Sequence, residues 1–173
     1  METGFGIGSE SKYGHEDRSR FVYVTFLAFL GFAIPFTFGH PQLLVGVLVN
    51  ALLVWSSLRL PLKMTLPVVF TPVLGVLARG LLFGPFTSYL ALMAPFIWIG
   101  NLILVYAFKS ERSFIFRLLS GSLAKAGFLY ASALLLNMLG LVPEALLTAM
   151  GIVQLATALG GGLLACSAVH LKK

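Results

Sequence analysis

Charged residues are scarce in this sequence, and their absence from two long stretches is its most informative feature. Only 10% of the residues are charged, whereas 58% are hydrophobic, and the mean hydropathy is +0.96. No Asp, Glu, Lys or Arg occurs between Arg20 and Arg59, or between Arg79 and Lys109. Soluble domains have about 25% charged residues, because their surface faces water. The sequence therefore predicts an integral membrane protein.

Patterns of catalytic and metal-binding residues are also lacking. The single cysteine, Cys166, lies in an apolar stretch, which excludes a disulfide framework and a Cys-based metal site. Beyond the first twenty residues the acids are Glu111 and Glu144 alone, and no H-E-x-x-H or Walker A sequence occurs. His40 and His170 fall near opposite ends of the predicted bundle, so no Ser–His pair shares a depth. We expect no enzyme activity, no metal site and no cofactor.

The net charge of +6 comes from cations that flank apolar runs. They do not form a stripe with interleaved aromatic residues, so the predicted partner of these cations is the lipid bilayer and not nucleic acid. The polar residues 1–20 are expected to form a cytoplasmic tail, followed by one transmembrane domain over residues 21–173. The apolar run that begins at Phe21 is too long for the core of a cleavable signal peptide.

Six apolar segments approach the length of about 20 residues that a helix needs to cross a bilayer. Ten of the twelve Lys and Arg residues lie in the tail, the second and fourth connections and the C-terminus, and none lies in the other three connections. Because cations are retained in the cytoplasm, the sequence predicts an all-α bundle of six transmembrane helices in the cell membrane, with both termini cytoplasmic. The predicted spans are 21–39, 42–60, 64–83, 86–108, 115–139 and 144–169.

Polar side chains inside these spans form the list of candidate functional residues, because such groups are costly in hydrocarbon and usually face a bundle interior. With a rise of about 1.5 Å per residue, they lie in the outer third (Arg79, Asn137), near mid-depth (Asn50, Gln154) or in the inner third (Asn101, Lys125). Arg79 could bind an anion at the rim of an outward-facing pocket, or could extend to the outer interface. Lys125 could be structural or could extend to the inner interface. The amides could simply join helices, but together they favour a shared polar interior.

These residues define a hypothetical binding site. We predict an outward-facing pocket with an apolar wall and a few polar groups, capped by the first connection. The candidate substrate-binding residues are Asn50, Arg79, Asn137, Gln154, His40 and Gln42. Asn101 and Lys125 are predicted to be inner polar or structural residues, and the cation Arg79 favours an anionic substrate.

Small residues and prolines predict how closely the spans pack. Pro67, Pro72 and Pro95 predict kinks, which can open a cavity. Small residues in the sixth span allow close helix approach, either within the bundle or at a docking face for a partner subunit. The candidate docking residues are Ala156, Gly160, Gly161, Gly162 and Ala165.

Several stretches together resemble a known family. They are Leu48-Val49-Asn50-Ala51-Leu52-Leu53, Ala94-Pro95-Phe96-Ile97-x-x-Gly100-Asn101, Lys125-x-x-Phe128-Leu129-Tyr130 and Gln154-x-x-Thr157-Ala158-Leu159-x-Gly161-Gly162. Over roughly residues 41–165 the chain resembles the substrate-binding (S) components of energy-coupling factor (ECF) transporters, and more closely a poorly characterised subgroup of S-component-like proteins.

The resemblance implies a subunit that captures a small-molecule micronutrient and works with a membrane scaffold subunit and two cytoplasmic ATPases. In that family a small-x-x-x-small motif of the first helix docks on the scaffold. Here Ala28, Gly31 and Ala33 lack that spacing, so either another face docks, such as the sixth span, or the shared scaffold is not used. The alternative function is a structural membrane subunit of a redox or ion-translocating complex, in which the polar residues only join helices.

Overall fold

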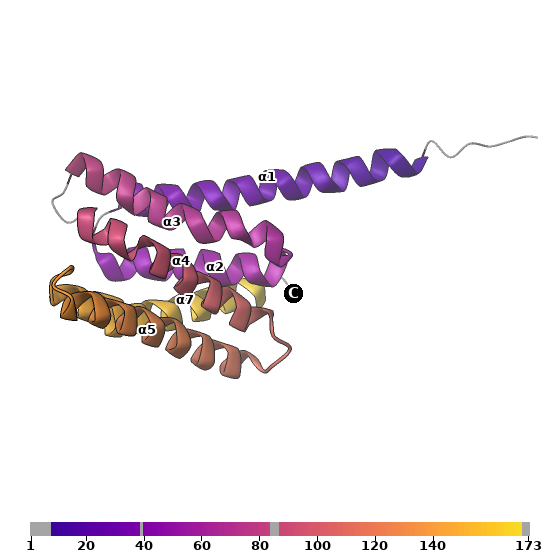
Figure 1. Cartoon of the computed structure of the whole chain (residues 1–173). Coiled ribbons are helices and arrows are strands. Elements are labelled where there is room, and N and C mark those ends of the chain that lie inside the picture. The colour runs from indigo at the N-terminus through magenta and orange to yellow at the C-terminus, as the bar shows by residue number, and fades with distance from the viewer. Residues whose placement is uncertain (1–7, 39, 84–86, 171–173) are drawn as a thin grey trace, which may run out of the picture.

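The computed structural model describes residues 8–38, 40–83 and 87–170, and all elements within these ranges are helices (Figure 1). Six helical stretches among them are long and apolar enough to cross a membrane. This confirms the predicted all-α six-helix bundle and identifies a multi-pass membrane protein. The helices are α1 (Gly8–Thr37), α2 (Gln42–Arg59), α3 (Leu62–Phe83), α4 (Thr87–Lys109), α5 (Phe114–Met138), α6 (Ala145–Met150) and α7 (Ile152–His170).

The first helix is longer than its predicted membrane span. It begins at Gly8 and not at Phe21, so most of the polar tract expected as a tail continues the transmembrane helix. In Figure 1 the N-terminal part of α1 extends well beyond the ends of the other helices. The membrane-spanning part of α1 is Arg18–Thr37, close to the predicted 21–39.

The sixth span is divided at Gly151 into α6 and α7. Gly151 has φ −95° and ψ −99°, outside the helical region, and its N–H donates to the Leu147 carbonyl oxygen at 2.9 Å. A Cβ at this position would lie 3.0 Å from both that oxygen and the ring of Tyr130 on α5. The break therefore lies where the backbone of this span contacts an aromatic ring, and the two parts together form the predicted span.

The helices pack mainly as three pairs, α1 with α3, α2 with α7, and α4 with α5. Helix α2 also contacts α1, α3 and α4, which gives it a central position in the bundle (Figure 1). A large apolar cluster fills one half of the interior, with Leu53, Val54, Leu104, Val105 and Phe108 almost completely buried. This half lies toward the end of the bundle that carries the basic connections.

Close approach of α7 to its neighbours depends on glycine. A Cβ at Gly161 would stand 2.6 Å from the Asn50 Cβ and 2.7 Å from the Val47 carbonyl oxygen, so α2 leaves room for hydrogen only. A Cβ at Gly162 would lie 2.4 Å from Leu118 of α5, and Ala165 is 2% exposed. Of the candidate docking residues, Gly161, Gly162 and Ala165 are therefore occupied by packing within the chain, and Ala156 is exposed.

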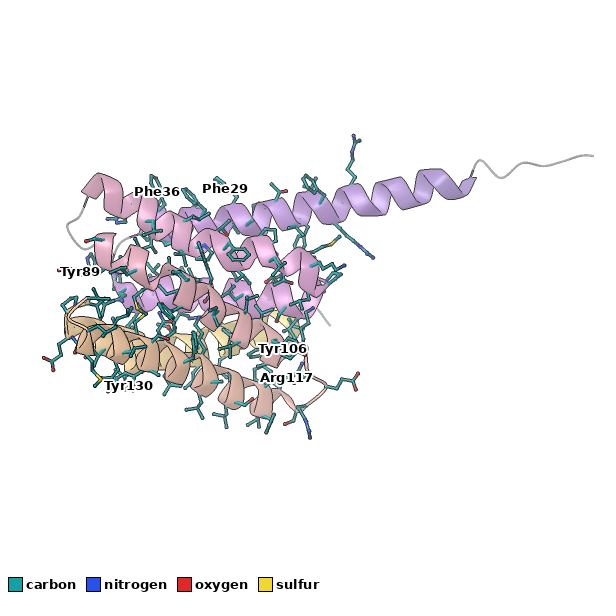
Figure 2. All side chains as sticks on the ribbon, in the orientation of Figure 1. Phe29, Phe36, Tyr89, Tyr106, Arg117 and Tyr130 are labelled. Carbon is teal, nitrogen blue, oxygen red and sulfur yellow. The ribbon has the colours of Figure 1, made fainter. Side chains whose placement is uncertain are left out.

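Basic side chains at one end of the bundle bind the ends of neighbouring helices. Lys109 donates to the Leu60 carbonyl oxygen, just after α2, and Arg117 donates to the Phe108 carbonyl oxygen at 3.2 Å. Cations near helix C-termini bind the free carbonyls and interact favourably with the helix dipole. Figure 2 shows Arg117 at this end and Tyr89 at the opposite end. The positive-inside rule predicts that the end with Arg117 is cytoplasmic.

The contact at Gly161 predicts a loss of stability on adding a single methyl group. Gly161→Ala should lower the free energy of unfolding by about 1–3 kcal/mol, the usual cost of overpacking a close contact. Thermal unfolding in detergent measures the change. Gly127→Ala on α5 is the control, because a Cβ there meets nothing within 4 Å. Equal losses in the two variants would contradict the close packing of α2 and α7.

The orientation of the bundle can be tested by labelling introduced cysteines in a Cys166→Ala background. Ser110 and Leu141 are exposed and lie in connections at opposite ends of the bundle. We expect Leu141→Cys to react with a membrane-impermeant maleimide in intact cells, and Ser110→Cys to react only after permeabilisation. The reverse pattern would mean that the basic connections are outside.

Candidate functional site

A cavity of about 320 Å³ lies in the half of the bundle opposite the large apolar cluster. Phe38, His40 and Gln42, all exposed, lie at its mouth, where α1 ends and α2 begins. This end of the bundle has the connections without Lys or Arg, so the cavity opens on the predicted outer side. Its polar lining residues come from five helices and the first connection: His40, Gln42, Asn50, Arg79, Asn101, Lys125 and Gln154.

Lys125 of α5 forms the centre of the cavity floor. Its side chain is 2% exposed, and its Nζ donates to the Asn50 Oδ1 at 2.6 Å and to the Asn101 Oδ1 at 2.8 Å. Asn50 belongs to α2 and Asn101 to α4, so one ammonium group joins three helices. Extension of Lys125 to the inner interface is therefore ruled out, because its nitrogen is bound inside the bundle.

The Asn50 amide is oriented by hydrogen bonds on its other side. Its Nδ2 donates to the Gly46 carbonyl oxygen at 2.9 Å and to the Thr157 Oγ1 of α7 at 3.2 Å. The Thr157 hydroxyl in turn donates to the Gln154 carbonyl oxygen at 3.1 Å. Both N–H groups of the amide are used in this way, which directs its carbonyl oxygen to Lys125.

The Asn101 amide is oriented by the backbone of α3. Its Nδ2 donates to the Val69 carbonyl oxygen at 3.2 Å, and Trp98, one turn earlier on α4, donates to the Phe70 carbonyl oxygen at 3.2 Å. These two carbonyls lie in the turn of α3 before Pro72, and they accept hydrogen bonds from two side chains of α4.

The ionisable side chains that line the cavity, His40, Arg79 and Lys125, are all basic. Among the described residues of the spans no Asp or Glu side chain faces Lys125, since Glu111 and Glu144 are exposed at the bundle ends. The two groups bound to the ammonium are neutral amides. Within the described ranges no three His, Cys, Asp or Glu side chains gather into a metal-binding group. The donor set can therefore bind acceptors and anions.

Arg79 of α3 lines the mouth of the cavity and binds the end of α1. Its Nη1 donates to the Phe36 and Thr37 carbonyl oxygens, both at 3.0 Å. These are terminal carbonyls of α1, so the guanidinium satisfies free acceptors and the negative end of the helix dipole. Both interpretations from sequence, anion binding at the rim and extension to the outer interface, stay predictions, and part of the donor capacity of Arg79 serves the fold.

Of the six candidate substrate-binding residues, Asn137 is the one that the structure does not place at the cavity. Its Nδ2 donates to the Val142 carbonyl oxygen at 2.8 Å, within the connection that follows α5. The other five, His40, Gln42, Asn50, Arg79 and Gln154, line the cavity.

Asn101 and Lys125, expected at a deeper level, line the same cavity. Sequence reasoning did not identify Thr157 of α7 as a residue of the site. Its hydroxyl orients the Asn50 amide at the cavity floor. The available signal was its spacing of three residues from Gln154, which places both on one face of a helix.

The hydrogen bonds of Lys125 with Asn50 and Asn101 predict that mutations at these residues have coupled effects on stability. Asn101→Leu removes one acceptor of the buried ammonium and should lower the free energy of unfolding by about 1–3 kcal/mol. Adding Lys125→Met to this variant should cost less than the same change in the unaltered chain, because the partner is already lost. Thermal unfolding in detergent measures the stability of the two single variants and of the double variant. The control is the same set with Asn137→Leu in place of Asn101→Leu. If the losses of stability are additive in both sets, the hydrogen bond between Lys125 and Asn101 is contradicted.

No family model, no curated protein and no solved structure matches the chain. The resemblance to S components therefore stays a prediction from the residues. The case for a function rests on the cavity and its floor.

Proposed function

We propose that this protein captures a small molecule from the outer side of the membrane, as the substrate-binding subunit of an ECF-type importer. The observation that carries the proposal is the cavity of about 320 Å³ whose polar floor is assembled from α2, α4 and α5. Small-molecule sites are concave, mostly apolar and contain a few placed polar groups. This cavity has that composition and lies at the lower end of the usual size range.

The apolar walls support binding rather than simple joining of helices. They consist of side chains from five helices and the first connection, namely Pro35, Phe38, Val45, Val49, Pro72, Val73, Val76, Leu77, Leu90, Ile97 and Met150. Polar residues that only joined helices would be packed against each other, leaving no accessible volume. Here Lys125 and both of its amide partners line an accessible cavity.

The closed floor favours a capture subunit over a channel. Beyond the Lys125 network, toward the basic end, the interior is filled by the large apolar cluster, with Leu53, Val54 and Leu104 0% exposed. A ligand that enters from the outer side meets this barrier, so its release inward requires the bundle to rearrange. The proposed partners, a membrane scaffold subunit and cytoplasmic ATPases, would supply that work, because the chain has no nucleotide-binding sequence.

Filling the cavity tests the proposal. Val76→Phe on α3 adds a ring to the cavity wall and should abolish retention of the bound compound. Leu74→Phe, on the lipid-exposed face of the same helix, is the matched control and should retain it. The measurement is mass spectrometry of small molecules that co-purify with each variant in mild detergent, relative to the unaltered protein.

The proteins that co-purify provide the second part of this test. Co-isolation of a membrane scaffold and ATPase subunits is expected. If redox or ion-translocating subunits co-purify in stable amounts, and no compound distinguishes Val76→Phe from Leu74→Phe, the protein is a structural subunit and the capture function is wrong.

A further inference from the structure

We infer that the captured molecule is a small carboxylate with an apolar body, and that its carboxylate binds the Lys125 ammonium at the cavity floor. The inference rests on the proposed capture function and adds the chemical class of the ligand. It is carried by the hydrogen-bonding capacity of Lys125, by the charge of the floor and by the apolar lining.

The Lys125 nitrogen has one donor more than the protein uses. An ammonium group has three N–H donors and no acceptor. Two donate to the oxygens of Asn50 and Asn101, at 2.6 Å and 2.8 Å. Both neighbours present acceptors, so both bonds use N–H donors of the nitrogen. Because Lys125 lines the cavity, the third N–H is available to an acceptor on a ligand.

The charge of Lys125 has no counterion among the described residues of the spans. Its side chain is 2% exposed, and the acids Glu111 and Glu144 are exposed at the bundle ends. A buried charge without an opposite charge is strongly disfavoured in a medium of low polarity. Two neutral amides offset part of this cost, and an anionic ligand in the cavity would offset the remainder. The site thus favours an anion over a neutral molecule of the same shape.

The few donors at the floor select a carboxylate among anions. The Asn101 amide has two N–H donors, of which one binds the Val69 carbonyl oxygen. Together with the third N–H of Lys125, the floor offers two donors, which matches the two oxygens of a carboxylate. A phosphate group has three acceptor oxygens and about two charges, more than the donors of the floor alone satisfy.

The walls above the floor specify the rest of the molecule. Val49, Val73, Val76 and Ile97 contribute aliphatic side chains to the lining. Apolar walls favour a hydrocarbon or aromatic body, and a volume of about 320 Å³ limits it to a small metabolite. In this arrangement Lys125 and the second N–H of Asn101 bind the ligand, whereas Asn50 is a positioning residue that holds the ammonium at the floor.

Matched pairs of acids and amides test the inference on the unaltered protein, purified in detergent and freed of bound compounds by dialysis. The probes are hexanoate, 4-methylpentanoate and phenylacetate, each compared with its primary amide, which keeps the shape and removes the charge. We expect at least one acid to raise the midpoint of thermal unfolding in a saturable way, with an affinity about ten- to a hundredfold above that of its amide, as expected for a charged hydrogen bond.

A pair of variants on α5 assigns the effect to the floor. Lys125→Met should abolish the preference for the acid, whereas Ala124→Met, at the neighbouring exposed position, should retain it. If Lys125→Met does not fold, the comparison of acid with amide in the unaltered protein decides alone. Equal affinities for acids and amides, or no acid that exceeds its amide, would overturn the inference.

The compound that co-purifies separates this inference from the proposed function. A carboxylic acid whose retention is lost in Val76→Phe supports both. A neutral or cationic compound lost in the same variant overturns the ligand class and leaves the capture function in place. No compound that depends on Val76, together with no acid preference, would overturn both.

Discussion

The interior of this protein depends on one buried cation, the Lys125 ammonium, held between the carbonyl oxygens of Asn50 and Asn101. A charge at 2% exposure within a membrane-spanning helix is stable only where acceptors surround it. Those acceptors come from α2 and α4, so the cation fixes how three helices converge. Because the two amides are neutral, neither of them neutralises the cation. The same interaction that holds the helices together therefore gives the cavity its chemistry.

The amides can hold the ammonium only because other helices orient them. Asn50 is bound by Thr157 of α7, and α7 approaches α2 closely because Gly46 and Gly161 have no side chain at the contact. Asn101 is bound by the Val69 carbonyl oxygen, in the turn of α3 that precedes a proline. Glycines, which weaken isolated helices, thus serve here to place polar groups. Their effect on the site is indirect, because they determine how closely the helices pack and thereby where the amides lie.

The two halves of the bundle differ in a way that suits capture from one side. Toward the basic end the interior is packed with apolar side chains, and toward the other end it contains the cavity. Arg79 joins α3 to the end of α1 at the mouth, so the rim is held by hydrogen bonds to backbone carbonyls. In the proposed function, this rim, the apolar walls and the closed floor would hold a ligand before any partner acts.

The sequence by itself determined the six spans, because the absence of charge over some 20 residues is a local property that hydrocarbon imposes on each helix separately. It also supplied nearly all polar residues of the site, since amide and charged side chains are few in the spans. It did not determine which of them meet: depth along the axis separated Lys125 from Asn50, yet the long lysine stem brings their polar atoms to 2.6 Å. Asn137 and Gln154 were both candidate binding residues by sequence, but Asn137 binds a connecting turn, whereas Gln154 lines the cavity. Only the tertiary structure decided this, because helix rotation, close glycine contacts and side-chain reach depend on all the helices together.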